Sequence, residues 1–322
     1  MIARLDGLGS PLLLSAHLDV VSPCRGVRPS REGDWIVSDG TTVLGADAKA
    51  AVAVLLEIGR VLGGRARDAR PALELLFTWG EEQGHRGAKA LDTSSLRSRL
   101  GLVLDALEPV GTIVHHAPTY EAVSVSVRTR GGHAGVDAGR GSSAIAIAAR
   151  AIAAFPWGQL DESTTANAGT LVGGTARNAI AAEVILEAEL RGLDDERLGM
   201  WREKLRGAFA VVETDGTESK VEFGRLYAGY KLAPDSAIVD LARQAFASIG
   251  GTAQLVHTFG GSDANELNAL GIESCVLGIG AERCHSTSER IAVSQLVRLA
   301  EWTSAIVDRW LLISARGARG TP

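Results

Sequence analysis

The sequence predicts an α/β protein in which a mixed, mostly parallel sheet forms one domain and a smaller α+β domain is inserted into it. Three observations support this prediction. The chain has 322 residues, which exceeds an average single domain and suggests two. Short apolar runs alternate with segments of helical periodicity in both outer parts of the chain, as in parallel α/β sheets. Between them the pattern changes to strands in which polar and apolar residues alternate.

The first outer part is expected to contain three strands and one long helix. Leu12 to Ala16 is a short apolar run that ends at His17 and reads as a buried strand. Asp47 is expected to cap a helix that runs from about Ala48 to the stop at Gly63 and Gly64. The remaining expected elements are a strand at Ala72 to Trp79, a turn at Gly80 to Gly84, and a strand at Gly101 to Leu104 that ends at Asp105.

The middle of the chain, residues 118–226, has the β-α-β-β-α-β order of a small ferredoxin-like domain. Its expected elements are a strand at Glu121 to Arg130, an Ala-rich helix at Ser142 to Phe155, two strands flanking Arg177 and Asn178, a helix from Asp194 to about Val211, and a strand at Lys220 to Leu226. Because the α/β pattern resumes afterwards, the first domain is expected to be discontinuous, with residues 1–117 and 227–322.

The last outer part returns to helices and one buried strand. Its expected elements are a helix at Asp235 to Ser248, a second helix capped by Asp263, a strand at Ser274 to Ile279, and a long C-terminal helix from Val293.

Composition and charge exclude several classes of partner. The net charge is −5 and no run of lysines or arginines occurs, which argues against a nucleic-acid partner. No apolar stretch reaches the roughly 20 residues of a membrane-spanning helix, and no membrane partner is expected. The N-terminus lacks the features of a secretory signal, and the three cysteines form no C-x-x-C pair. We therefore expect a cytoplasmic protein.

Ligand-type side chains follow the expected strands. In open α/β sheets, ligands bind at the carboxyl ends of the strands. There the sequence places His17, Asp19, Asp47, Glu81, Glu82, Asp105 and His285. Each alone has an ordinary structural interpretation, such as a helix cap or a solvated turn. Together they would repel one another unless a cation lay between them, because clustered carboxylates destabilise each other's charged forms.

The ligand types indicate a two-metal site. Imidazole and carboxylate without thiolate suit zinc, cobalt or manganese. Two such ions would share one bridging carboxylate and together activate a water molecule. In an extended Glu81-Glu82 pair the side chains diverge, so that one can bind metal while the other acts as general base.

Five segments resemble the signatures of a known family of dizinc exopeptidases and deacylases, which includes peptidase T, aminoacylase, glutamate carboxypeptidase and succinyl-diaminopimelate desuccinylase. The segments are Ser15-Ala16-His17-Leu18-Asp19, Leu44-Gly45-Ala46-Asp47-Ala48-Lys49, Thr78-Trp79-Gly80-Glu81-Glu82-Gln83-Gly84, Gly260-Gly261-Ser262-Asp263-Ala264-Asn265 and His285-Ser286-Thr287-Ser288-Glu289. They occur in one consistent order from about Leu12 to Val307, and the glycine-rich fourth segment is closest to the peptidase T-like branch.

This resemblance implies a role for each site residue. His17, Asp47 and Asp105 would hold one zinc ion, and Asp47, Glu82 and His285 the other. Asp19 would orient the region of His17 or Glu81, and Glu81 would be the general base. The family often has a second acidic residue after the bridging aspartate, joined to it by a cis peptide, and Ala48 stands there instead.

The resemblance also implies that the inserted domain is a lid and a dimerisation domain. His133 in Gly131-Gly132-His133-Ala134-Gly135 matches a histidine that the family presents to substrate across a dimer; as a turn residue it also has a purely structural interpretation. Asn178 and Arg191 match lid positions that hold substrate oxygen atoms or a terminal carboxylate, and Gly260 and Gly261 are expected near the substrate. A strand edge at Val123 to Val127 and the Ala-rich helix are expected to pack against a symmetric copy.

Three functions remain open at this point. The first is a zinc aminopeptidase that acts on short peptides. The second is a deacylase of N-acyl amino acids that uses the same site. The third is a catalytically silent binding protein, although none of the seven expected site residues is lost. No H-E-x-x-H, G-x-S-x-G or P-loop motif points to another enzyme class.

Overall fold

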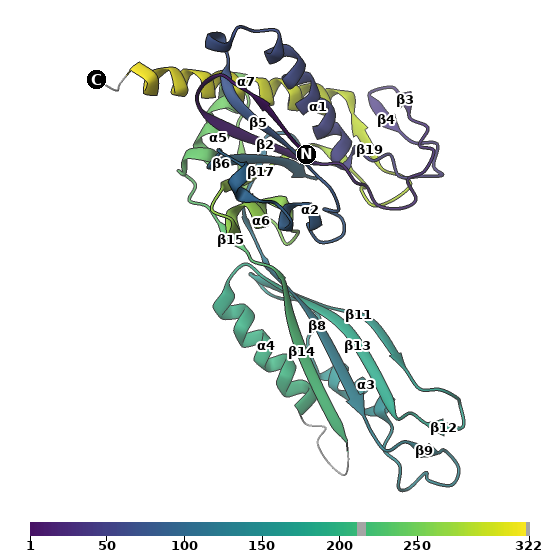
Figure 1. Cartoon of the computed structure of the whole chain (residues 1–322). Helices are drawn as coiled ribbons and strands as arrows, with labels where there is room; N and C mark the ends of the chain where they lie inside the picture. The colour runs from purple at the N-terminus through teal and green to yellow at the C-terminus, as the bar shows by residue number, and fades with distance from the viewer. Residues whose placement is uncertain (211–216, 320–322) are drawn as a thin grey trace. The chain divides into compact units, whose positions relative to one another are not determined.

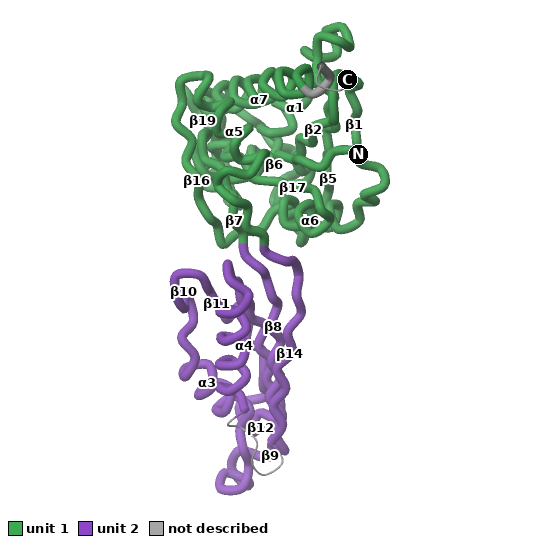
Figure 2. The backbone as a smooth tube through the Cα atoms, turned by 90° about the vertical axis from the view of Figure 1, so that its left-hand side faces the viewer, with its two compact units in different colours: residues 1–117, 230–322 green, residues 118–229 purple. Residues whose placement is uncertain are grey.

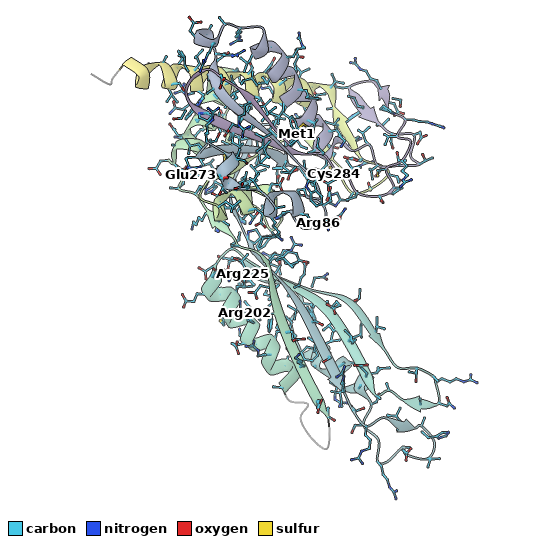
Figure 3. The ribbon with its side chains drawn as sticks, viewed as in Figure 1. Met1, Arg86, Arg202, Arg225, Glu273 and Cys284 are labelled. Atoms are coloured by element: carbon cyan, nitrogen blue, oxygen red, sulfur yellow. The ribbon has the colours of Figure 1, made fainter. Side chains whose placement is uncertain are left out.

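The computed structural model describes residues 1–210 and 217–319 and divides into two compact units, which Figure 2 colours separately. Unit 1 comprises residues 1–117 and 230–322, and unit 2 comprises residues 118–229. The last strand of unit 2 continues to Tyr227, so the second boundary falls slightly later than residue 226. No helix in the described ranges combines the length and the apolar character that crossing a membrane requires.

Unit 1 is built on a mixed sheet with the strand order β1-β5-β2-β6-β17-β7-β15, and β16 also pairs with β7. The neighbouring strands β5, β2, β6 and β17 run parallel, whereas β1 and β7 are antiparallel to the strands beside them, β5 and β17. A mainly parallel central sheet is thus confirmed. The strands are β1 (Ile2–Leu5), β2 (Leu8–His17), β5 (Pro71–Thr78), β6 (Leu100–Ala106), β7 (Thr112–Ala117), β15 (Tyr230–Lys231), β16 (Gln254–His257) and β17 (Glu273–Gly278).

Helices cover both faces of this sheet (Figure 1). Leu12 and Leu14 of β2 pack in one core with α1 (Ala46–Gly63), α5 (Ala237–Ser248) and α7 (Val293–Arg319). Leu13 packs in a second core, which includes residues of α6 (Asp263–Ala269). This alternation follows from the period of two in a strand, and it explains why the run Leu12 to Leu14 is apolar throughout. A short helix, α2 (Arg86–Lys89), packs beside α6.

Two predicted helix caps are wrong. The residue before α1 is Gly45, and Asp47 and Ala48 have non-helical backbone angles inside the first turn, with a cis peptide bond between them as expected. Asp47 therefore does not cap the helix. Helix α6 is capped by Ser262, whose side chain accepts a hydrogen bond from the N–H of Ala264, and Asn265 completes a capping box. Asp263 is the first residue of the helix instead.

A small four-stranded sheet joins distant parts of unit 1. Among the described residues its order is β18-β19-β4-β3, and all its pairs are antiparallel. The strands are β3 (Ser30–Glu32), β4 (Trp35–Val37), β18 (Ala281–Glu282) and β19 (Arg290–Ala292). The loop between β18 and β19 carries His285, so this sheet fixes both ends of that loop. Two short 3-10 helices, η1 (Arg67–Ala69) and η2 (Thr93–Ser95), complete the unit.

Unit 2 contains an antiparallel sheet with the order β10-β11-β13-β8-β14. Its elements are β8 (Thr119–Arg128), α3 (Ala144–Ala154), β10 (Gly158–Asp161), β11 (Thr164–Gly173), β13 (Glu183–Gly192), α4 (Asp195–Ala210) and β14 (Glu218–Tyr227), with a small pair formed by β9 (Gly132–His133) and β12 (Ala179–Ile180). The predicted helix end at Val211 lies outside the described residues.

Both helices of unit 2 pack on one face of its sheet. Ala148 of α3 and Leu205 of α4 share a core with Val123, Val125 and Val127 of β8. The prediction that Val123 to Val127 forms a sheet edge is wrong, because β8 lies between β13 and β14. The alternation of polar and apolar residues in β8 fits a central strand with one covered face.

Candidate active site

The predicted metal ligands come from five separate segments of unit 1. His17 is the last residue of β2, and Asp105 lies inside β6 next to its end. Asp47 lies in the irregular first turn of α1, Glu82 follows β5, and His285 lies in the loop between β18 and β19. Within residues 1–210 and 217–319, their ligand atoms fall into groups whose members lie within 4.8 Å of one another. Two of the groups share Asp47: His17, Asp47 and Asp105 form one, and Asp47, Glu82 and His285 form the other. A third group combines His17 and Glu82 with Glu81.

His17 is buried and faces two carboxylates. Its Nε2 lies 3.1 Å from Asp47 Oδ1 and 3.1 Å from Asp105 Oδ1. Its Nδ1 lies 2.9 Å from the backbone oxygen of Asp19, which can only accept a hydrogen bond. The Nδ1 proton is therefore held by that carbonyl, and Nε2 is directed at the carboxylates. This is the arrangement by which a second partner orients a metal-binding histidine.

Asp47 faces a different histidine with each of its two oxygens. Oδ1 lies beside His17, and Oδ2 lies 3.4 Å from His285 Nε2. His285 Nε2 also lies 3.2 Å from Glu82 Oε2. The side chain of His285 is 55% exposed, so this end of the cluster is open to solvent. A carboxylate with one oxygen on each side can bridge two cations.

Glu289 holds the backbone around Asp47. Its two carboxylate oxygens accept hydrogen bonds from the N–H of Gly45 at 2.6 Å and from the N–H of Asp47 at 3.0 Å. Glu289 is buried and lies in the same loop as His285. Glu289 belongs to the segment His285-Ser286-Thr287-Ser288-Glu289, and no role was predicted for it. Its position four residues after His285 was the only signal in the sequence for such a role. The N–H of Asp47 that it binds lies 242 residues away in the chain.

Asp19 orients the turn that carries Glu81 and Glu82. Its Oδ1 accepts a hydrogen bond from the N–H of Glu81 at 3.1 Å, and its Oδ2 accepts one from the N–H of Glu82 at 3.2 Å. The predicted turn at Gly80 to Gly84 is present, and the expected extended conformation of the Glu81-Glu82 pair is wrong because both residues lie in this turn. The two side chains nevertheless have different partners, since Glu82 faces His285 and Glu81 faces His85. His85 was not among the predicted site residues.

The electrostatics of the cluster fit a cation. Burial raises the pKa of Glu81 to about 10, and the charge of Asp105 adds to this effect. Burial also raises the pKa of Asp105 to about 7. For His17, burial lowers the pKa, but the charges and hydrogen bonds of Asp105 and Asp47 outweigh it and raise the pKa to about 12. The cluster therefore retains protons that a bound divalent ion would replace.

The carboxylate of Asp263, near the cluster, also supports the interpretation that the cluster binds a cation. Asp263 is buried, and its Oδ2 accepts a hydrogen bond from Thr78. Its Oδ1 is buried with no hydrogen-bond partner among the described residues. Burial raises its pKa, and its charge contributes to the raised pKa of Glu81 and of Asp105. Such an accumulation of carboxylates is costly unless positive charge accompanies it.

The three predicted substrate-side residues of the inserted domain all lie in unit 2. His133 and Asn178 lie close together, because β9 pairs with β12 and the N–H of Ala134 donates to the Asn178 carbonyl. Both are exposed. His133 Nδ1 accepts hydrogen bonds from the N–H groups of Gly135 and Val136, so the proton of the neutral ring is on Nε2 and is available to a ligand.

Arg191 lies towards the other end of β13. Its guanidinium donates to both carboxylate oxygens of Glu189 and lies 4.3 Å from the ring centre of Tyr120. The predicted substrate contact would have to compete with these partners. In unit 1, Gly260 and Gly261 lie in the loop that precedes α6, and the N–H of Gly260 binds the Thr258 side chain at 3.0 Å.

Comparisons with known proteins agree with this geometry. The model of the family described as peptidase family M20/M25/M40 matches residues 13–309. An uncharacterised Bacillus subtilis protein, YqjE, is 38% identical over 92% of this chain and 80% of its own length. The crystal structure of aminopeptidase PepT from Bacillus cereus is 39% identical with a TM-score of 0.88, over 96% of this chain and 84% of that one. A Staphylococcus aureus tripeptidase is 36% identical with a TM-score of 0.92, over 97% and 84%.

Proposed function

Because the chain belongs to peptidase family M20/M25/M40 and is therefore a metal-dependent hydrolase of peptide bonds, we propose that it is a peptidase T-like aminopeptidase that acts on short peptides through two zinc ions. The observation that carries the proposal is the pair of ligand groups that share Asp47. The similarity to an aminopeptidase and a tripeptidase, each above 35% identity over most of the chain, supports the substrate class.

The donor set fits a pair of zinc ions. His17 and Asp105 would hold one ion, Glu82 and His285 the other, and Asp47 both, with one oxygen on each side. Imidazole and carboxylate ligands without thiolate suit zinc, and also suit cobalt or manganese. When bound, the ions would polarise the scissile carbonyl and lower the pKa of the attacking water. Asp19 and Glu289 would keep the ligand-bearing segments in place through the backbone N–H groups that they bind.

Glu81 would act as the general base. Glu81 belongs to a third ligand group with His17 and Glu82, but neither of the two groups that contain Asp47 needs it. Its carboxylate would accept a proton from the attacking water and deliver it to the nitrogen of the leaving amine, which is the usual sequence for a general base that later acts as an acid.

Residues of unit 2, together with Gly260 and Gly261 of unit 1, would supply the substrate contacts. We propose that the Nε2–H of His133 donates to the developing oxyanion, and that Asn178, Arg191, Gly260 and Gly261 contact other substrate atoms. We further propose that the protein forms a homodimer through unit 2, so that His133 serves the site of the partner subunit, and that it works in the cytoplasm. The exposed position of His133 and its free Nε2–H support the role as a donor.

The experiment compares substrates that differ only at the amino end. Protein purified without chelator is incubated with a panel of tripeptides and with the same peptides acetylated at the α-amine. We expect release of the amino-terminal residue from the free peptides and little cleavage of the acetylated ones. Preferential removal of the acyl group would instead identify an N-acyl amino acid deacylase. Binding of the peptides without turnover of any of them, in protein that carries metal, would overturn the assignment as an enzyme.

A further inference from the structure

We propose that His85 is a positioning residue that holds the carboxylate of Glu81 in the orientation from which it accepts a proton. The inference rests on the proposed role of Glu81 as general base. It concerns a side chain that lies outside both ligand groups that share Asp47, and that would act on the reaction only through Glu81.

The ring of His85 lies between two carboxylates. Its Nε2 is 3.4 Å from Glu81 Oε1, and its Nδ1 is 3.3 Å from Glu266 Oε1 in α6. Lys89 Nζ lies 3.8 Å from the same Glu266 oxygen, which places a positive charge behind it. Because His85 is buried, its ring has little freedom to rotate away from this arrangement. Glu266 thus fixes the ring, and the ring faces Glu81.

The turn that follows β5 brings His85 back to Glu81. The N–H of His85 donates to the Glu81 carbonyl at 2.9 Å, and the N–H of Gly87 donates to the Trp79 carbonyl at 2.8 Å. A Cβ atom at Gly87 would lie 2.6 Å from the Trp79 carbonyl oxygen, so only glycine permits this closure. His85 itself has φ of 60°, a conformation uncommon for a residue other than glycine. Such a placement at a candidate active site is a reason to look for function.

A fixed Oε1 has a chemical consequence for Glu81. A carboxylate that serves as general base must present one oxygen to the water, and free rotation would disperse that oxygen over many positions. With Oε1 against His85, rotation is restricted and Oε2 is left for the water. Correct orientation of a catalytic group contributes strongly to rate, and a misplacement of about 1 Å can cost roughly a hundredfold.

The test compares two replacements of His85 that differ in polarity but are similar in size. We expect His85→Leu to lower kcat by about tenfold to a hundredfold, by analogy with the cost of removing a partner that orients a metal ligand. KM, metal content and melting temperature are expected to stay near the wild-type values. His85→Gln keeps a polar group that can donate to Glu81, and we expect it to recover most of the lost kcat. Equal losses for both variants, or no loss for His85→Leu, would overturn the proposal.

A second comparison separates this inference from the role of Glu81. We expect His85→Leu to cause no further loss in a Glu81→Gln background, because the histidine acts only through the carboxylate. A full additional loss in that background would overturn the inference and leave the general base intact. Full activity of Glu81→Gln alone would instead overturn the proposed function. Should His85→Leu fold poorly, Glu266→Gln provides the same test, with an expected fall in kcat that disappears when Glu81 is already replaced.

Discussion

At the scale of single residues, the site depends on carboxylates whose two oxygens each contact a different partner. Asp47 faces His17 with one oxygen and His285 with the other. Glu289 uses its two oxygens for two backbone N–H groups, and Asp19 does the same for the turn at Glu81 and Glu82. Asp47 therefore faces the two histidines, whereas Glu289 and Asp19 bind backbone N–H groups of the segments that carry the ligands. This arrangement explains why the ligands come from distant segments yet lie within a few ångströms of each other.

The neighbouring glutamates provide the first prediction. We expect Glu81→Gln to keep the wild-type metal content and to lose at least about a hundredfold in kcat, because removal of a general base typically costs 10²- to 10⁴-fold. We expect Glu82→Gln to lose metal, since its Oε2 faces His285 beside Asp47. Metal analysis and steady-state kinetics on both variants decide the matter. Loss of metal from Glu81→Gln with retention in Glu82→Gln would mean that the two roles are exchanged.

At the scale of elements, local patterns in the sequence predicted the main strands and helices and the turn at Gly80 to Gly84, but not the long-range contacts that hold the site together. The apolar run Leu12 to Ala16 and the strand ends at His17 and near Asp105 are local properties, and the fold agrees with them closely. The cap at Asp47 was predicted wrongly because the N–H groups there are satisfied by Glu289, far away in the chain. The turn at Gly80 to Gly84 was predicted, but the Glu81-Glu82 pair within it was wrongly predicted to be extended, because the turn closes through contacts with Asp19 and Gly87.

Local sequence patterns also predicted only some of the residues of the candidate site. The ligand residues could be found because strand ends gather at one edge of a parallel sheet, which is a rule about topology. His85 could not be found in this way, since it follows a turn and reaches Glu81 only when that turn closes. Its partner Glu266 lies 181 residues further along the chain.

A buried glutamate in β5 provides a prediction at this scale. Glu74 is fully buried, and its carboxylate accepts hydrogen bonds from the N–H groups of Arg97 and Ser98 and from the Arg4 side chain. It thereby attaches β5 to the segment that leads into β6. Burial raises its pKa, but the hydrogen bonds from Ser98 and Arg97 outweigh burial and lower it. We expect Glu74→Gln to reduce the free energy of unfolding by about 2 kcal/mol near neutral pH, because hydrogen bonds to a charged group are worth roughly 1.5–3 kcal/mol.

The pH dependence of this effect follows from the direction of the shift. A carboxyl group whose pKa is lowered by folding stabilises the folded state above its unfolded pKa of about 4.3. That contribution is lost as the pH falls through the lower folded pKa. The difference in urea unfolding between wild type and Glu74→Gln should therefore shrink below about pH 4. Glu57→Gln, on the exposed face of α1, is the control and should show little difference; a constant difference for Glu74→Gln at every pH would contradict the argument.

At the scale of the whole molecule, the proposed chemistry is divided between the two units. All the metal-binding candidates lie in unit 1, whereas His133 lies on the small β9–β12 pair of unit 2. The backbone N–H groups at His133 Nδ1 leave the Nε2–H as the donor that a substrate could meet. Dimerisation would allow one chain to supply the ligands and the general base while the other supplies this donor.

A complementation experiment tests whether His133 acts on the site of the partner subunit. His133→Ala is expected to lower kcat by about 10²- to 10³-fold, the usual cost of losing one donor to an oxyanion. Mixing it with the inactive Glu81→Gln under conditions that exchange subunits should restore one working site in each mixed dimer, provided that His133 acts on the partner's site. Activity should then rise to about half the wild-type value per mixed dimer. Verified exchange of subunits without any recovery would mean that His133 acts within its own chain or has only a structural role.

The central claim is that the pair of ligand groups sharing Asp47 holds two metal ions that the reaction requires. The most direct measurement is the metal content per chain of protein purified without chelator, together with peptidase activity before and after chelation. The account predicts about two equivalents of zinc and loss of activity on chelation, with His285→Ala retaining about one equivalent and Asp47→Ala almost none. Retention of at most one equivalent in the wild type, with activity unaffected by chelator, would contradict it.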